Sequence, residues 1–263
     1  MSPGFVRALV ALSLVPVAFV GFGGTAQAAQ TCGAASSSFT GGYSAFSSAI
    51  FGTRSRIEYN NPDLCGSDAD GPGISVVWSM VTAPSDSSPT NNDRVGWAQT
   101  GYGQFGGASA YTTGIWNFAQ WTRKCKNVGT CGSDLEDIVH TVYLDHPSGA
   151  QMYANVLRAS DDFIHMYVDG VELTKTTYNP AGDWDAAWQG QFFAETHEKS
   201  SDVVGTSTDV TSMDYLQKYD SAGGVAFFST INGSTTSGTR YHRSAYSPTV
   251  GGNGLKIWTD PLS

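Results

Sequence analysis

Short runs of strand-forming residues, separated by clusters of Gly, Pro, Asn, Asp and Ser, recur from residue 54 to the end of the chain. Such runs, bounded by turn-forming residues, are typical of β-strands, and no long segment has the spacing of an amphipathic helix. The succession predicts an all-β fold in which two antiparallel sheets pack face to face as a β-sandwich. The expected strands are 74–82, 94–100, 115–122, 138–144, 151–158, 163–168, 171–178, 188–197, 225–231 and 255–259.

The composition agrees with one compact domain and excludes several other classes. The 263-residue chain is 40% hydrophobic, 12% aromatic and only 14% charged, and it contains 31 glycines. Disordered chains and coiled coils need a much larger charged fraction. The formal net charge of -9 does not suit the cationic surface that binds nucleic acid or an anionic membrane, so neither is expected as a partner.

The first 28 residues have the features of a secretory signal peptide. Arg7 supplies a positive charge, residues 8–22 are apolar but too few to cross a bilayer, and Ala26 and Ala28 form a small-x-small cleavage site. We therefore expect a secreted, extracellular protein with no membrane span after the signal is removed. The expected organisation is a signal peptide at 1–28, a Ser/Gly-rich N-terminal arm at 29–49 and a β-sandwich domain at 50–263.

Four cysteines follow the expected cleavage site, and an even number in an oxidising compartment indicates disulfides. Three pairings are possible. Cys32 with Cys65 and Cys125 with Cys131 are favoured, because the second pair encloses a short Gly-containing loop and the first fixes the N-terminal arm. A zinc site would need closely spaced CxxC pairs, which the sequence lacks.

One segment is a candidate for a helix of one or two turns. In residues 209–219, Met213, Leu216 and Tyr219 recur at helical spacing. The rest of the domain is expected to be strands and turns.

A two-residue turn at Asp169-Gly170 predicts a β-hairpin whose register can be written out. A type I′ turn places Val168 opposite Val171 and Met166 opposite Leu173, with Ile164 on the same apolar face. The opposite face then carries His165 across from Thr174 and Tyr167 across from Glu172. This face is expected to be polar and aromatic.

The run 188–197 alternates in the same way. Trp188, Phe192 and Ala194 point to one side, which is expected to be the core. The other side carries an unusual polar set: Gln189, Gln191, Phe193, Glu195 and His197. If the hairpin belongs to the same sheet, its polar residues His165, Tyr167 and Glu172 would line a common concave face with this set; the alternative is an ordinary solvated face.

Carboxylate chemistry is the catalytic possibility that the sequence leaves open. The motifs of serine hydrolases, zinc proteases and nucleotide-binding proteins are absent. Glu195 is the main catalytic candidate because it shares a strand face with His197 and two glutamines, and a second carboxyl group could act as its acid partner. Glu58 is the second catalytic candidate, and Glu172 is another possible partner.

Aromatic residues provide a binding interpretation that needs no catalyst. Trp97, Trp121 and Tyr167 lie in glycine-rich or polar surroundings, where an exposed ring could stack on a sugar or hold a peptide. Trp78, inside an apolar run, is expected to be buried. No metal or other cofactor is expected, although the acidic clusters at 68–71 and 134–137 leave calcium as an alternative.

A succession of short sequence words resembles the neprosin domain. The words are Arg56-Ile57-Glu58-Tyr59-Asn60-Asn61-Pro62, Ser75-Val76-Val77-Trp78, Val95-Gly96-Trp97 and Phe118-Ala119-Gln120-Trp121-Thr122, followed by Cys125 and Cys131. The resemblance extends loosely over residues 50–200. It implies a secreted β-sandwich of a family whose plant-type members include glutamic endopeptidases with a pair of glutamates. No matching motif assigns either glutamate to a position in this chain.

A second, shorter resemblance concerns the fold. The segment Phe163-Ile164-His165-Met166-Tyr167-Val168-Asp169-Gly170 is similar to a strand-turn segment of concanavalin-like glucanases and lectins, which implies a concanavalin-like or jelly-roll sandwich. The functional hypothesis is a secreted protein that binds an extended extracellular peptide or polysaccharide on a concave Gln/Glu/His/aromatic face, with hydrolysis as a further option. The alternatives are a glutamic endopeptidase of neprosin type and a non-catalytic structural cell-surface protein.

Overall fold

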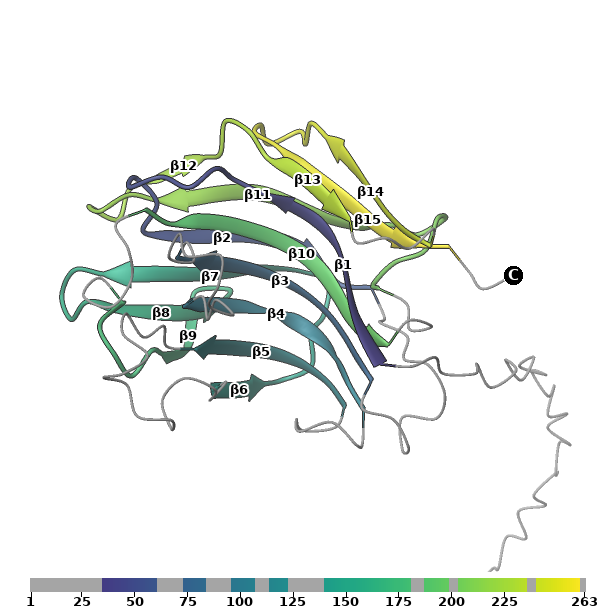
Figure 1. Ribbon diagram of the computed structural model, residues 1–263, viewed down its shortest axis with the longest axis horizontal. Coiled ribbons are helices and arrows are strands. Elements are labelled where there is room, and N and C mark those ends of the chain that lie inside the picture. Colours follow the sequence, from purple (N-terminus) through teal and green to yellow (C-terminus); the bar gives the residue numbers. More distant parts are fainter. Residues whose placement is uncertain are drawn as a thin grey trace, which may run out of the picture.

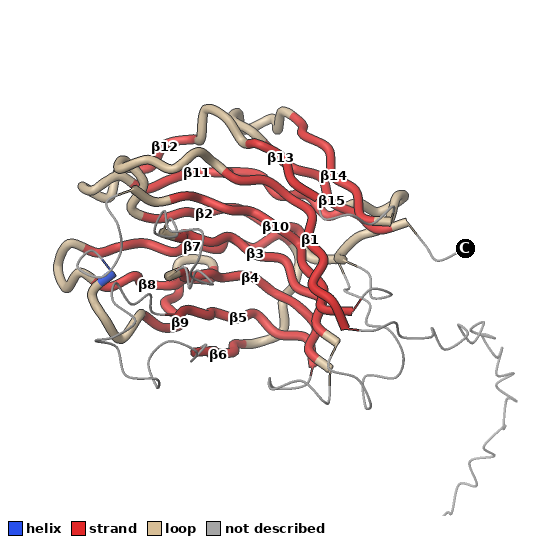
Figure 2. Tube along the Cα trace, in the orientation of Figure 1, coloured by secondary structure: helices blue, strands red, loops and turns tan. Residues whose placement is uncertain are grey.

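The computed structural model describes residues 35–60, 73–83, 96–106, 114–122, 140–180, 187–198, 203–235 and 240–260. The named elements in these ranges are strands (Figure 1, Figure 2). Their bounds are β1 Ala35–Tyr43, β2 Gly52–Glu58, β3 Ile74–Thr82, β4 Trp97–Phe105, β5 Gly114–Thr122, β6 His140–Leu144, β7 Ala150–Arg158, β8 Phe163–Val168, β9 Val171–Lys175, β10 Gln189–Glu198, β11 Thr211–Tyr219, β12 Val225–Phe227, β13 Asn232–Thr235, β14 Tyr241–Tyr246 and β15 Gly254–Thr259.

The strands form two large sheets. The seven-stranded sheet has the order β13-β1-β10-β3-β4-β5-β6, and the second sheet has the order β14-β15-β11-β2-β7-β8-β9, with β12 paired to β11. The neighbouring strands of both sheets are antiparallel. The two sheets lie one behind the other in Figure 1, with β10 and β1 in front of β11 and β2. The prediction of an all-β sandwich of two antiparallel sheets is confirmed.

Strand β1 lies inside the seven-stranded sheet, between β10 and β13. The sequence places residues 35–43 in a surface arm because small polar residues dominate there. In the structure this segment pairs with β10 on one side and β13 on the other: Thr40 is fully buried, and its hydroxyl lies 2.8 Å from the hydroxyl of Thr235. The boundary expected at residue 50 is therefore corrected, since the sandwich already includes β1.

Strand β11 occupies the segment that is a helix candidate in the sequence. Its pairing with β2 shifts register between Asp214 and Gln217, and Tyr215 has a φ of 50°. This β-bulge adds one residue to the strand, so Met213 and Leu216, three positions apart, are both fully buried. The spacing that indicates a helix is produced here by a bulged strand.

The β8–β9 hairpin has the predicted turn and a different register beyond it. Asp169 and Gly170 have φ angles of 49° and 80°, and Val168 pairs with Val171, as predicted. A register shift after the Tyr167 pair then places Met166 opposite Thr174 rather than Leu173. In the same way His165 pairs with Lys175 rather than Thr174.

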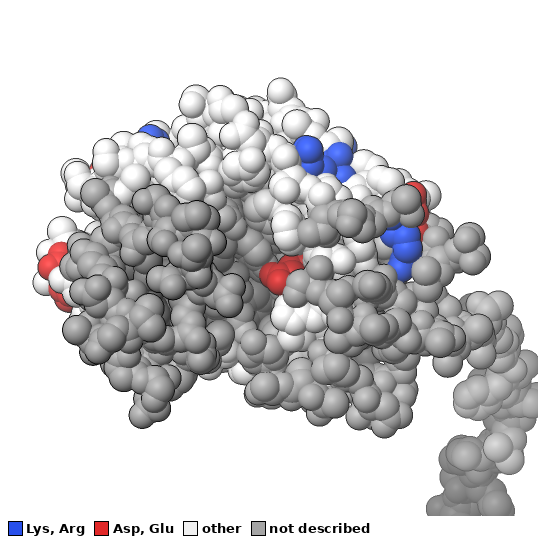
Figure 3. Space-filling model, in the orientation of Figure 1, with Lys and Arg blue, Asp and Glu red and all other residues white. Residues whose placement is uncertain are grey.

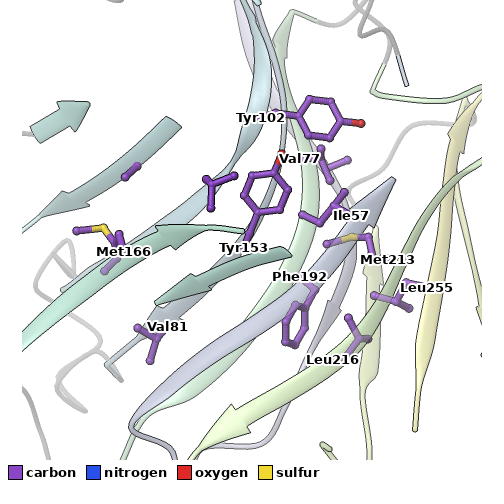
Figure 4. Packing of buried hydrophobic residues seen from close by; sticks show 14 of the residues in the cluster. Ile57, Val77, Val81, Tyr102, Tyr153, Met166, Phe192, Met213, Leu216 and Leu255 are labelled. Carbon is purple, nitrogen blue, oxygen red and sulfur yellow. The ribbon is translucent and has the colours of Figure 1, made fainter. Parts of the chain in front are cut away.

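The main core fills the space between the sheets. Figure 4 shows apolar side chains from both sheets meeting there, among them Val77 and Phe192 from one sheet and Met213 and Leu216 from the other. The core also holds buried polar contacts: the Tyr153 hydroxyl donates to Asn117 Oδ1 over 2.7 Å and so joins the two sheets. The sandwich is therefore fixed by apolar packing together with satisfied hydrogen bonds.

Several sequence predictions lie outside the described residues. They concern the signal peptide, the four cysteines Cys32, Cys65, Cys125 and Cys131, and the acidic clusters at 68–71 and 134–137. Within the described residues, no group of acidic, His or Cys side chains is arranged to hold a metal ion. The same part of the chain contains no helix that is long and apolar enough to span a bilayer.

Candidate functional site

A pocket of about 430 Å³ opens on the outer face of the seven-stranded sheet, on the side away from the main core. In Figure 3, acidic atoms lie in a hollow near the middle of the face that β10 and β3 present in Figure 1. The lining is mainly apolar and aromatic with a few polar side chains: Phe39, Ile74, Val76, Trp78, Met80, Trp97, Gln99, Phe105, Gln120, Gln191, Phe193, Glu195 and His197.

The strand register explains how this hollow forms. Residues directly opposite in neighbouring strands point to the same face, so the outward side chains of β10, β3 and β4 lie in transverse rows. Phe193 on β10 is opposite Trp78 on β3, and Trp78 is opposite Gly101 on β4. In the next row Val76 is opposite Gly103. The two glycines leave part of the floor without side chains beside Trp78 and Val76.

Glu195 is the acidic residue among the described residues that line the pocket, and its carboxylate is held at both oxygens. The indole N–H of Trp78 donates to Oε2 over 3.2 Å. The His197 Nε2 lies 3.1 Å from Oε1, within hydrogen-bonding distance. The Glu195 side chain remains 25% exposed, so the carboxylate is oriented by the protein and still accessible from the pocket.

Side-chain amides form a second polar group in the same pocket. The Gln99 Nε2 donates to Gln120 Oε1 over 2.7 Å, and the Gln120 Nε2 donates to Thr141 Oγ1 over 3.1 Å. On β10 the Gln191 Nε2 donates to Gln189 Oε1 over 2.6 Å. These bonds fix the amides in an otherwise apolar surface, where they can contact the backbone of a bound polymer.

The structure brings some of the candidate catalytic and binding residues from the sequence together in this pocket. The alternation of β10 is as predicted: Trp188, Phe192 and Ala194 belong to the main core, whereas the polar set faces outward. The outward residues in the pocket include Gln191, Glu195 and His197 from β10 and Trp97 from β4. Gln189 is 8% exposed and contacts the pocket residue Gln191.

The other candidates lie elsewhere. Trp121 is 4% exposed and packs in the main core, because it occupies the inward parity of β5. Glu58 ends β2 in the second sheet, where its carboxylate accepts a hydrogen bond from the Ser212 hydroxyl over 2.6 Å. It therefore does not pair with Glu195.

The hairpin residues His165, Tyr167 and Glu172 are also on the second sheet, in β8 and β9. The common face expected for them and the polar residues of β10 is therefore corrected: strand alternation gives the side of each strand, but not the sheet to which that strand belongs. His165 is 5% exposed and lies between two carboxylates, 3.0 Å from Asp161 and 2.9 Å from Glu172.

Among the pocket residues that are not sequence candidates, three carry hydrogen-bonding side chains: Trp78, Gln99 and Gln120. Trp78 was assigned to the core, and its low exposure of 5% is consistent with that, but its ring lies in the pocket wall. Gln99 and Gln120 are opposite each other on β4 and β5. The sequence contains a signal for both, since each is an isolated amide on an aromatic strand face: Gln99 alternates with Trp97, and Gln120 with Phe118.

The carboxylates around His165 predict that the stability of the fold depends on pH. Hydrogen bonds from Lys175 and then from His165 hold the pKa of Asp161 well below its usual range. Burial raises the pKa of Glu172, but the hydrogen bond and charge of His165 outweigh it and the net direction is downward. A carboxyl group with a depressed folded-state pKa stabilises the fold above its unfolded pKa, and this stabilisation is lost as the pH falls.

We therefore expect the melting temperature to fall as the pH is lowered from about 4 towards 2. In Asp161→Asn this part of the pH dependence should be weaker, because the replaced group no longer titrates. Thermal unfolding followed by circular dichroism at several pH values gives the slope of melting temperature against pH for the parent and for the variant. Equal slopes in the parent and the variant would contradict the assignment to Asp161.

No family model matches the chain, and no curated protein matches it. Among solved structures, scytalido-glutamic peptidase with a peptide-based transition-state analogue aligns with a TM-score of 0.48 and 8% identity over 86% of this chain and 99% of that chain. SCP-B, an eqolisin-family peptidase in complex with the tripeptide Ala-Ile-His, aligns with a TM-score of 0.46 and 10% identity over the same shares.

A pseudo β-1,3-glucanase of Mycobacterium tuberculosis is also similar, with a TM-score of 0.30 and 13% identity over 80% of this chain and 65% of that chain. These are structural likenesses at low sequence identity. The activities in their names are those of the other proteins. The resemblance to the neprosin domain stays a prediction.

Proposed function

We propose that this chain is a secreted protein that binds an extended polymer, in the first place a peptide, in the pocket on the outer face of the seven-stranded sheet. The observation that supports this most is the chemistry of the lining: a broad apolar and aromatic surface that contains one oriented carboxylate and a few fixed amides. Ligand sites commonly have this composition, because apolar area supplies affinity and a few polar groups fix the orientation.

A peptide suits this lining better than a glycan does. Sugar hydroxyl groups need many hydrogen-bonding partners, and a buried hydroxyl without a partner is costly. Here β3 presents one apolar row to the pocket, in which Trp78 lies between the aliphatic residues Val76 and Met80. Peptide side chains can fill such a surface, while the amide of Gln99 or Gln191 contacts the peptide backbone.

Hydrolysis is the second candidate function, and the geometry of Glu195 supports it. An oriented, accessible carboxylate can act as a general base that takes a proton from the water attacking a peptide carbonyl. His197, 3.1 Å from the carboxylate, is placed to return a proton to the leaving amine. A glutamic endopeptidase of neprosin type remains part of this proposal, although the described pocket lining provides no second glutamate to complete a pair. A structural cell-surface protein without a ligand is the remaining alternative.

The test of the proposed function is incubation of the purified chain with a mixed peptide library at acidic and neutral pH. We expect peptides to be retained on the protein, as measured by mass spectrometry of the bound fraction. If the chain is also an enzyme, cleavage products should appear, and Glu195→Gln should reduce the cleavage rate by about 100-fold or more, because it removes the general base.

Glu58→Gln is the matched control, since it removes the same charge from the second sheet and leaves the pocket unchanged. It should behave as the parent does. Cleavage that persists in Glu195→Gln would overturn the role of this carboxylate. A chain that retains no peptide and binds an oligosaccharide panel instead would overturn the peptide proposal, and failure to retain either would favour the structural alternative.

A further inference from the structure

We infer that the pocket selects a peptide with a cationic side chain, that of lysine or arginine, whose charged end lies against Glu195 and the aromatic rings around it. This rests on peptide binding, the first part of the proposed function, and names the ligand class for the same site. It is an alternative to the hydrolytic role of Glu195, because a carboxylate paired with a cation does not take a proton from water.

The carboxylate of Glu195 has aromatic neighbours on several sides. Phe39 on β1 is directly opposite Glu195 in the β1–β10 register. Phe193 precedes Glu195 by two residues on the same strand face, and Trp78 is directly opposite Phe193. Strand pairing therefore places three rings on consecutive strands around one carboxylate.

The rings also contact one another, so they form a continuous wall. The ring centroids of Phe39 and Phe193 are 5.3 Å apart with an interplanar angle of 84°, and those of Trp78 and Phe193 are 5.4 Å apart at 40°. The Trp78 N–H donates to Glu195 Oε2, which ties the carboxylate to this wall. We call Phe39, Trp78, Phe193 and Glu195 the aromatic-carboxylate cluster.

A cationic side chain can interact with both the aromatic rings and the carboxylate of this cluster. The faces of aromatic rings carry negative electrostatic potential and attract an ammonium or guanidinium group, most strongly where water is excluded. A carboxylate accepts more than two hydrogen bonds, so Glu195 retains acceptor capacity beyond those from Trp78 and His197. The apolar stem of lysine or arginine would pack on the aliphatic wall while its charged end reaches the carboxylate.

The charge balance of the pocket points to the same ligand. The described lining residues include one carboxylate, one histidine 3.1 Å from it, and neither lysine nor arginine. Within the part of the chain that the structure describes, no lysine or arginine forms a salt bridge with Glu195. The formal net charge of -9 on the whole chain adds a long-range attraction for cationic peptides. A neutral apolar side chain would fill the pocket without using the carboxylate.

The test compares three peptides that differ at one central position: lysine, acetyl-lysine and norleucine. Isothermal titration calorimetry with the purified chain should give about tenfold or greater tighter binding of the lysine peptide than of either neutral peptide, a preference that weakens at high salt. This comparison needs no substitution in the protein, so a variant that fails to fold cannot obscure it.

Two variants then assign the preference to the cluster. Glu195→Gln should bind the three peptides almost equally, and Phe193→Leu should reduce the preference for lysine while binding of the norleucine peptide is largely retained. Glu58→Gln should keep the full preference. Circular dichroism spectra and melting temperatures identify any variant with altered folding.

The possible outcomes separate this inference from the proposed function. Equal binding of lysine and norleucine peptides would overturn the selection of a cation but leave peptide binding in place. A lysine preference that survives in Glu195→Gln would overturn the role of the cluster. If none of these peptides binds and the mixed library is also not retained, both the inference and the proposed function are overturned.

Discussion

Phe192→Ala is expected to lower the free energy of unfolding by about 3–5 kcal/mol, the range found when a buried phenylalanine is truncated in a core that cannot collapse around the cavity. Phe192 is fully buried on the inward face of β10. Its ring packs against Phe228 with the centroids 5.7 Å apart, and Figure 4 shows it between the two sheets near Leu216. Urea denaturation followed by tryptophan fluorescence measures the change.

The matched control is Phe46→Ala. Phe46 is 46% exposed, so its removal should change the free energy of unfolding by less than about 0.5 kcal/mol. Similar losses of unfolding free energy in both variants would mean that the inward side chains of β10 do not form the core as described. The pocket that we propose binds a peptide is on the opposite face of β10, so Phe192→Ala should leave any peptide binding unchanged under conditions in which the variant is folded.

Gly101→Ala is expected to affect both stability and binding. A Cβ atom at this position would collide with the Val77 carbonyl oxygen and lie 2.8 Å from the Trp78 Cα, both in the neighbouring strand. These are backbone atoms, so the sheet itself must shift, at a cost of about 1–3 kcal/mol. The displaced Trp78 would also alter the floor and wall of the pocket. We therefore expect denaturation to give a lower free energy of unfolding and peptide titration to give weaker binding.

Gly170→Asn serves as the control for Gly101→Ala. A Cβ atom at Gly170 meets nothing within 4 Å, and asparagine tolerates the positive φ of this turn position. The control should retain peptide affinity and most of the stability. If Gly101→Ala were as stable as the parent, the close approach of β4 to β3 would not be a constraint on the fold.

Strand alternation could be predicted from the sequence because it is a local property. On β10 the alternation places Phe192 in the core and Glu195 with His197 on the opposite face, as the structure has them. On β3 the apolar run predicts that Trp78 is buried, and it is; the structure buries both faces of the strand, one in the main core and one in a second apolar cluster that includes Trp78.

The arrangement of strands within the sheets could not be predicted, because pairing depends on contacts between residues far apart in the chain. Glu195 and Trp78 are 117 positions apart in the sequence and adjacent in the pocket. The same limit explains why the sequence leaves open whether His165 and Glu195 share a sheet, whereas the structure places them in different sheets. Bulges have a similar effect: the extra residue in β11 reverses the alternation after Asp214, and nothing in the local pattern indicates it.

Both faces of β3 and β10 are in use, which matters for the design of variants of this protein. On each of these strands, residues of one parity face the main core and residues of the other parity line the pocket, so the main core and the proposed binding surface use alternate positions of the same segments. A combinatorial library restricted to the outward positions, such as 76, 78, 80, 191, 193 and 195, would vary ligand preference while every inward neighbour stays fixed. In an evolving lineage, the same interleaving would allow the pocket to diverge without replacing the core.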